Sequence, residues 1–259
     1  MAVGSATSGT ATVYINPTTS VNWYVYLSVS AIGQTFTINS LSVKQVLGLT
    51  GTGATPKGLL IEEQRTNLVL QSQAFTSAAW AVAGLTRTDN ASVSPSGETN
   101  AASLVSSATS GVHVAYNVAA ITVTAGATTT LTAYVKANGY NFVSVFLNDN
   151  TANYVTGETR QVYNLASGTV GTAYGLTTGQ TASIAPVGNG WFRISLTQTF
   201  ASAARNISIG PMPSDADPRL TGFTGNGTSG MFIYGAQLEA GAFATSYIPT
   251  VASQVTRAA

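Results

Sequence analysis

The sequence contains no cysteine and only one histidine among its 259 residues. The lack of cysteine excludes disulfide bonds, thiol catalysis and thiolate metal sites. Charged residues make up 7% of the chain, against about 25% in an ordinary soluble domain. The surface must therefore consist largely of Ser, Thr, Asn, Gln, Gly and Ala side chains. Such a surface repels neighbouring molecules weakly and suits a protein that works within an assembly.

The charges that exist are balanced and scattered. Ten basic residues stand against nine acidic ones, which gives a net charge of +1. Nucleic-acid binding needs clustered Lys and Arg side chains, so we expect no nucleic-acid partner. No apolar run approaches the roughly 18 residues of a membrane span, and residues 1–17 lack the basic and apolar regions of a signal peptide. We expect synthesis in a cytoplasm and no membrane partner.

Signals for helices are nearly absent, and short β-rich runs alternate with Gly, Asn and Ser turns. This pattern predicts an all-β fold, a two-sheet antiparallel β-sandwich (jelly roll) with a small N-terminal β subdomain. Asn138-Gly139, between two alternating runs, predicts a hairpin with a type I′ turn. In the main body, strands are predicted at Ala101–Val105, Val112–Val118, Thr128–Lys136, Asn141–Leu147, Thr159–Asn164, Thr181–Ile184, Trp191–Thr199, Asn206–Ile209 and Met231–Glu239.

Two domains are predicted. Residues 1–57 hold about three strands and a Gly/Thr-rich linker at Gly48–Lys57, and we expect them to serve in assembly or anchoring. Residues 58–259 form the jelly roll. Thr37–Lys44 can be laid over Phe232–Glu239. This match indicates either a truncated second sandwich at the N-terminus or the patterning that strands share in general.

The stretch Gly230–Thr250 is the most strand-like of the chain. Its period of two places Phe232, Tyr234, Ala236 and Leu238 on one face, and Ile233, Gly235, Gln237 and Glu239 on the other. After Gly241, the aromatic residues Phe243 and Tyr247 are expected to fold back on the sheet, and Pro249 to end the pairing.

Three segments carry a resemblance to a known family: Gly58–Leu68 (GLLIEEQRTNL), Tyr234–Gly241 (YGAQLEAG) and Thr245–Thr250 (TSYIPT). With Trp80, Thr132–Lys136 and Gly190–Leu196, residues 58–257 resemble tailed-bacteriophage virion proteins whose jelly-roll domain is similar to carbohydrate-binding modules. The resemblance implies a place in tail fibres, receptor-binding proteins or head-surface proteins. Residues 1–57 lack a long coiled-coil or collagen-like shaft, which favours a compact decoration, cement or head-fibre-base protein.

Catalytic chemistry finds little support. His113 lies in the alternating run Gly111–Tyr116, on one face with Ala115, and has no Asp close in sequence. We therefore expect a solvent-facing or hydrogen-bonded strand histidine. Adjacent Glu62 and Glu63 would point to opposite faces of an extended segment, so they cannot act as a hydrolytic pair.

A cation site is also weakly indicated. Asp215 and Asp217 share one side of a Pro-rich loop, and oxygen ligands at i and i+2 suit a hard cation. Two carboxylates without a third make a solvated turn the stronger interpretation. We expect no metal and no cofactor.

Other polar and aromatic residues receive structural or binding roles. Glu62, Glu63 and Arg65 are predicted to pair with Arg257 or another strand, or to line a subunit interface. Aromatic rings stack on the apolar faces of sugars. Tyr154 and Tyr174, close to Gly-rich loops, are the predicted glycan-stacking residues.

These features favour a non-enzymatic virion structural protein on the particle surface, as capsid decoration or cement, head fibre or tail-fibre component. Its expected partners are copies of itself, with a trimer favoured, and other virion proteins such as the capsid or tail. The alternative is a carbohydrate-binding module or receptor-binding protein that recognises a host surface glycan. A depolymerase is disfavoured by the scarcity of acidic residues and histidine.

Overall fold

The computed structural model describes residues 62–150, 157–216 and 222–258. Within these ranges every regular element is a β-strand, and Arg65–Arg257 form one compact unit. The described residues include no helix that is long and apolar enough to cross a membrane. The strands predicted in residues 1–57, the linker Gly48–Lys57 and the domain boundary at residue 57 lie outside the described residues.

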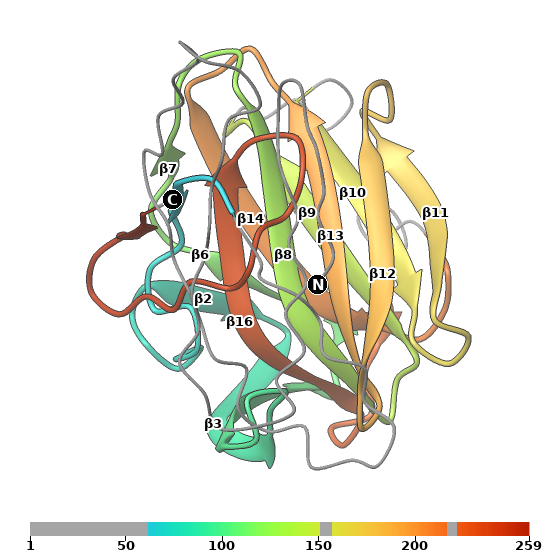
Figure 1. The fold of residues 1–259 in the computed structure, drawn as a ribbon. Coiled ribbons are helices and arrows are strands. Elements are labelled where there is room, and N and C mark those ends of the chain that lie inside the picture. The colour runs from blue at the N-terminus through green and yellow to red at the C-terminus, as the bar shows by residue number, and fades with distance from the viewer. Residues whose placement is uncertain (1–61, 151–156, 217–221, 259) are drawn as a thin grey trace, which may run out of the picture. The chain divides into compact units, whose positions relative to one another are not determined.

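Two large antiparallel sheets make up the fold (Figure 1). The chain passes repeatedly between them, which confirms the predicted two-sheet antiparallel sandwich. The six-stranded sheet has the order β12 (Thr181–Gly188), β13 (Trp191–Thr199), β8 (Thr128–Asn138), β16 (Gly230–Ala240), β4 (Thr99–Ser106) and β3 (Leu85–Val93). The seven-stranded sheet has the order β11 (Thr169–Gly175), β10 (Glu158–Asn164), β9 (Phe142–Asn148), β14 (Ala204–Met212), β6 (Val114–Asn117) and β2 (Trp80–Ala83), and β7 (Ile121–Thr122) also pairs with β14.

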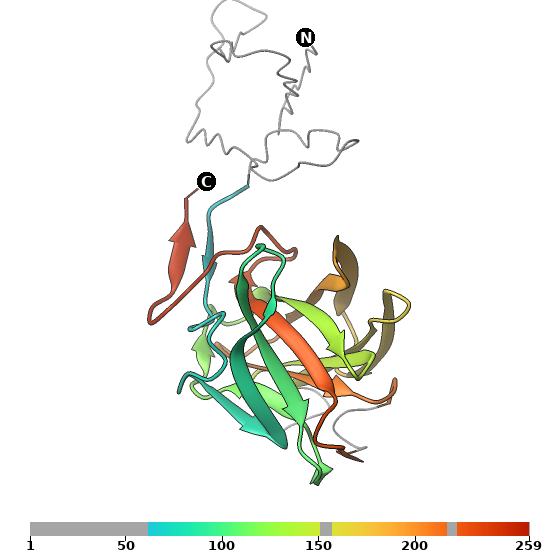
Figure 2. The ribbon, with the colours of Figure 1, turned by 90° about the horizontal axis from the view of Figure 1, so that it is seen from below.

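Two short sheets complete the fold. One pairs β1 (Arg65–Asn67) with β17 (Val255–Arg257), and the other pairs β5 (Ser110–Gly111) with β15 (Phe223–Thr224). Figure 2 shows β1 and β17 running side by side although they come from opposite ends of the described chain. The predicted strand Trp191–Thr199 is β13 with the same ends, and the other strands predicted in the main body are found with shifted ends. β2, β3, β11 and the short strands β5, β7, β15 and β17 were not predicted.

The hydrophobic core lies between the two large sheets. The six-stranded sheet contributes the alternating residues Leu131, Ala133 and Val135 of β8, and the seven-stranded sheet contributes Val143, Val145 and Leu147 of β9. All six are no more than 2% exposed. Side chains alternate between the two faces of a sheet along each strand. Every second residue of these strands therefore points into the core.

The predicted faces of β16 are wrong beyond its middle. Met231 and Ile233 lie in the core, but so do Ala236 and Leu238, which have the opposite parity. The register with β8 shifts between Tyr234 and Gln237, and Gly235 has a φ of 65°. A bulge with glycine in the left-handed region adds one residue to the strand and exchanges its two faces.

The predicted Asn138-Gly139 hairpin is also wrong. β8 ends at Asn138 and belongs to the six-stranded sheet, whereas β9 begins at Phe142 and belongs to the other sheet. Gly139 does have a positive φ of 98°, but Asn138 does not, so the type I′ turn, which needs both, does not form. The segment carries the chain from one sheet to the other.

Candidate functional site

The described part of the segment Gly58–Leu68 meets the segments Tyr234–Gly241 and Thr245–Thr250 in one structural unit. We call β1, residues 236–240 of β16 and residues 241–257 the clamp. β1 pairs with β17 so that Arg65 lies opposite Arg257, and Leu68 N donates to Leu238 O at 2.8 Å. The clamp therefore ties the beginning of the compact unit to its end through the closing strand of the six-stranded sheet.

Asn67 is the centre of the clamp. Its side chain is fully buried, and its Nδ2 donates to Ala236 O at 3.2 Å and to Ile248 O at 2.8 Å. Its Oδ1 accepts from Val69 N at 3.1 Å and from Leu238 N at 3.2 Å. A single amide thus joins three chain segments.

Glu239 holds the chain that follows β16. The carboxylate is buried and accepts from Thr245 N at 2.8 Å, Thr245 Oγ1 at 2.7 Å and Gln237 Nε2 at 3.0 Å. Arg65 Nε lies 4.0 Å from Glu239 Oε2, and Arg65 Nη1 donates to Ala240 O. These contacts engage both oxygens in structural bonds, so Glu239 is not available as a general acid or base.

Tyr247 of the clamp joins two other tyrosine rings on the outer face of the six-stranded sheet. Tyr247 packs on Tyr134 and Tyr234, with centroid separations of 6.3 and 5.4 Å. Its hydroxyl lies 2.5 Å from Ser72 Oγ. Burial raises the pKa of Tyr247 to about 12 and also raises the pKa of Tyr234. Tyr247 folds back on the sheet as the sequence predicts, whereas Phe243 is 58% exposed.

The predicted structural residues are placed as follows. Arg65 and Arg257 lie on the paired strands β1 and β17, and Arg257 Nη1 donates to Ser246 O at 3.0 Å. Glu62, which is half-buried, and Glu63, which is exposed, precede β1. Both arginines are thus part of the clamp, on neighbouring strands.

Asp215 forms a latch between its loop and β11. Its carboxylate accepts from Thr172 N at 3.0 and 3.1 Å and from Thr172 Oγ1 at 3.0 Å. Its predicted companion Asp217 lies outside the described residues. Across the described ranges no three His, Asp or Glu side chains are grouped as a metal ion would require. These bonds hold the carboxylate of Asp215 against β11.

His113 is buried rather than solvent-facing. It is 2% exposed, and its ring packs on Phe223 with the centroids 4.2 Å apart. Nε2 lies 3.3 Å from Ser107 O, and Nδ1 has no partner within the described residues. The predicted strand at Val112–Val118 begins only at Val114 because Gly111 pairs with Phe223 of β15. His113 therefore lies on the crossing between two sheets and shares no strand face with Ala115.

Tyr174, one of the two predicted glycan-stacking residues, lies on the outer face of the seven-stranded sheet. Residues paired directly across strands share a face. The pairing places Tyr174, Arg160, Phe146, Ser208 and Tyr116 in one row across five strands. Tyr174 is half-buried, and its hydroxyl donates to Asp215 O at 3.4 Å. The other predicted residue, Tyr154, lies outside the described residues.

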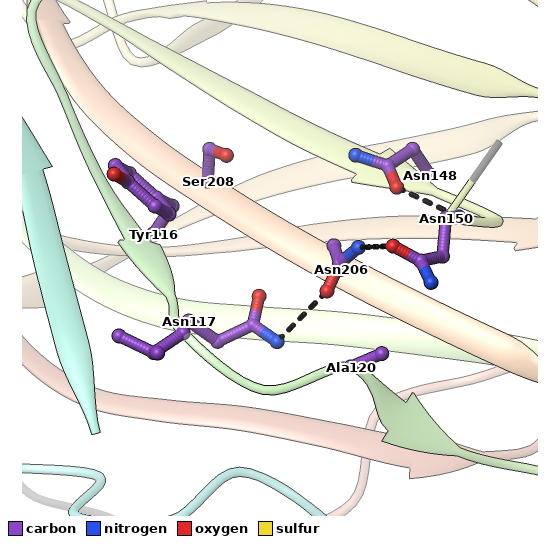
Figure 3. Close-up of a pocket in the computed structure, with 8 residues that line it drawn as sticks. Tyr116, Asn117, Ala120, Asn148, Asn150, Asn206 and Ser208 are labelled. Atoms are coloured by element: carbon purple, nitrogen blue, oxygen red, sulfur yellow. Dashed lines mark hydrogen bonds between the residues drawn. The ribbon is translucent and has the colours of Figure 1, made fainter. Parts of the chain in front are cut away.

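At the opposite end of this row lies a hollow of about 440 Å³ (Figure 3). Tyr116, at 37% exposure, forms one side of it. Four strand steps of about 4.8 Å separate Tyr116 from Tyr174, so the two rings lie about 19 Å apart. The hollow is lined by Tyr116, Asn117, Val118, Ala120, Asn148, Asn150, Asn206 and Ser208.

Asparagine side chains form a chain of hydrogen bonds along the hollow, as Figure 3 shows. Asn117 Nδ2 donates to Asn206 Oδ1 at 3.2 Å, and Asn206 Nδ2 donates to Asn150 Oδ1 at 2.6 Å. The backbone N of Asn150 donates to Asn148 Oδ1 at 2.9 Å. These bonds fix the amides, and leave the Nδ2 groups of Asn148 and Asn150 without a partner in the described part of the chain.

The hollow can therefore offer fixed amide donors and hydroxyl groups beside an exposed aromatic ring, without any charge. This chemistry suits a neutral polyhydroxyl ligand. The sequence gives no signal for this hollow, because Asn148-Asp149-Asn150 has the composition of an ordinary turn. Asn206 and Tyr116 lie 90 residues apart in sequence, so only the strand pairing shows that they are neighbours.

Comparisons with known proteins add little. No family model and no curated protein matches the chain. One solved structure with similarity contains the CBM22-1 and GH10 modules of the N-terminal endo-1,4-beta-D-xylanase 10B from Clostridium thermocellum, complexed with xylohexaose. The match has 13% sequence identity and a TM-score of 0.37, and covers 73% of this chain and 30% of that one. This chain thus spans about a third of the xylanase chain, and the match supports no functional conclusion.

Proposed function

We propose that this chain is a non-enzymatic structural protein of a bacteriophage virion. It would be made in the host cytoplasm and built into the particle surface as capsid decoration, head fibre or tail-fibre component. It would act through assembly with copies of itself and with other virion proteins such as the capsid or tail.

The clamp is the observation that carries this proposal. The residues that carry the resemblance to the virion family are the ones that bond to each other here: Asn67 bonds to Ala236, Leu238 and Ile248, and Glu239 bonds to Thr245. The side chains of a catalytic motif would point into a cleft. The side chains of Asn67 and Glu239 instead form hydrogen bonds that close the fold. The signature is therefore explained by architecture.

The state of the acidic residues also supports a role without catalysis. Besides Glu239, the buried carboxylate of Glu158 pairs with Arg160 at 2.9 Å, and Asp89 accepts from Phe75 N and Thr76 N at 3.0 to 3.3 Å. Each is committed to a structural bond. Hydrolysis of a glycan needs two carboxylates that flank the scissile bond.

The oligomeric mass of the purified protein tests this proposal. Multi-angle light scattering across the micromolar range should give the mass of a closed oligomer of the 26.5 kDa chain. A sharp monomer mass at every concentration, together with no binding to purified particles that lack the chain, would contradict the assembly function.

Recognition of a surface glycan is a second candidate function, favoured by the hollow beside Tyr116. Replacing the ring, Tyr116→Ala, should weaken the binding of a neutral oligosaccharide about tenfold, because ring contacts and one hydrogen bond together contribute roughly 1.4 kcal/mol. A glycan array would supply the ligand and titration calorimetry the affinity. Phe243→Ala serves as the control, since Phe243 is an exposed aromatic ring that does not line the hollow. Equal affinities for wild type and Tyr116→Ala would refute this candidate.

A further inference from the structure

Four strands form the outer edges of the two large sheets: β2 and β11 in one, β3 and β12 in the other. An edge strand presents unpaired N–H and C=O groups, and can therefore pair with a strand of another molecule. Proteins that stay monomeric protect such edges with charges, bulges, proline, short strands or covering segments. The four edges of this sandwich differ in how well they are protected.

Three of the edges are protected. β2 is only four residues long. β3 changes register between Thr88 and Ser92, and its charged residues Arg87 and Asp89 hydrogen-bond the neighbouring segment at Phe75 and Thr76. The register of β11 with β10 shifts between Gln161 and Tyr163, and the N–H of Thr172 on β11 already donates to the carboxylate of Asp215.

β12 has much weaker protection. It is eight residues long, its sequence TASIAPVG has no charged residue, and in the described part of the chain it pairs with β13 alone. Thr181, Ser183 and Ala185 are exposed, whereas Ala182 and Ile184 turn toward the core. Pro186 lacks an N–H and interrupts an added ladder only near the C-terminal end of the strand. Residues 181–185 thus remain an open, uncharged edge.

We propose that β12 is a self-association strand, which pairs antiparallel with β12 of a second copy of this chain across a two-fold axis. The two six-stranded sheets then join into one continuous sheet. The inference rests on the proposed assembly function and names the surface through which assembly occurs. Pro186 limits the ladder to residues 181–185, so the axis passes close to Ser183, and Thr181 of one copy faces Ala185 of the other.

The absence of charge on β12 allows a second copy of this chain to pair with it. In a two-fold antiparallel pair, the residue at the axis faces itself, and like charges placed directly opposite each other are destabilising. β12 has none. The outer face next to it already carries cross-strand hydroxyl pairs, Ser183 with Ser195 at 2.7 Å and Thr130 with Thr197 at 2.8 Å. A second β12 would continue this row of hydroxyl pairs across the axis.

Charge pairing at Ser183 tests the proposal. Ser183→Lys and Ser183→Asp each place like charges at the axis, and both lose the same bond to Ser195. We expect each variant alone to raise the Kd of the dimer at least tenfold, and an equal mixture of the two to restore the dimer. Thr88→Lys, on the exposed side of β3, is the matched control and should leave the Kd unchanged. Far-ultraviolet circular dichroism and the urea midpoint of each variant establish that it is folded.

A cysteine scan gives an independent readout, because the chain has no natural cysteine. Ser183→Cys should form a covalent dimer on oxidation, faster than Thr181→Cys and much faster than Thr88→Cys. Cross-linking that is equal at all three positions would overturn the inference.

The outcomes separate this inference from the assembly function. An isologous contact by itself yields a dimer. A trimeric mass, or an oligomer that both charge variants leave intact, would refute pairing through β12 while the assembly function stands. A wild-type protein that is monomeric at every concentration and does not bind particles would overturn both.

Discussion

Replacing Asn67 by alanine should cost more stability than almost any other single change in this protein. The amide makes four hydrogen bonds to three segments, and all four bonds are buried. A net contribution of about 1 kcal/mol for each bond predicts a loss of about 4 kcal/mol. Since a domain is stable by roughly 5–15 kcal/mol in total, such a loss is a large part of the whole.

Urea unfolding measures this loss. Trp80 and Trp191 are both buried, at 1% and 2% exposure, so their fluorescence reports the transition. Asn226→Ala is the matched control: Asn226 is exposed, its bonds to described residues stay within its own loop, at Thr228 and Ser229, and its loss should cost about 1 kcal/mol. A change below about 1 kcal/mol for Asn67→Ala, with an unaltered urea slope, would refute the central role given to this amide.

Three further predictions concern buried polar groups. Arg205→Lys should destabilise the fold by about 2–3 kcal/mol in the same urea assay, because Arg205 is fully buried and donates to Thr129 Oγ1 and four carbonyls, which an ammonium group cannot all reach; equal stability would contradict this. Glu239→Gln should loosen residues 242–250, because the added NH₂ cannot accept from Thr245, and hydrogen exchange at Thr245 N should rise at least tenfold while the core strands keep their protection. Folding holds Tyr247 as the neutral phenol and raises its pKa from 10.0 to about 12, so its contribution is complete below pH 10 and is lost as the pH rises toward 12. Tyr247→Phe should reduce this alkaline loss of stability, as pH-dependent urea midpoints would show, and an unchanged pH dependence would refute the assignment.

Much of the fold follows from the sequence. The alternation of Leu131, Ala133 and Val135 identifies β8 and its buried face, because a strand that covers one core has a period of two. The same rule fails for β16 after Gly235, where one extra residue exchanges the faces. On β3 the alternation of burial holds up to Asp89, but the inward residues Arg87 and Asp89 are charged and bond to the segment at Phe75, so an apolar pattern does not identify this strand. Local patterns do not contain these long-range constraints.

The candidate sites were harder to predict. The clamp could be anticipated in part, since Arg65 and Arg257 belong to segments that the family resemblance already connected. Its central residue Asn67 gave no signal of its own, because an asparagine in an extended run is usually interpreted as a turn or surface residue. The hollow beside Tyr116 depends on the register of β6, β14 and β9, which no short motif encodes.

The proposed virion role is tested most directly by cryo-electron microscopy of virus particles purified from lysed cells in which this chain is made. We expect β-sandwiches on the particle surface, in symmetry-related copies, with β1 and β17 paired in each and with neighbouring copies joined along β12. Purified particles without this chain at their surface would contradict the virion role.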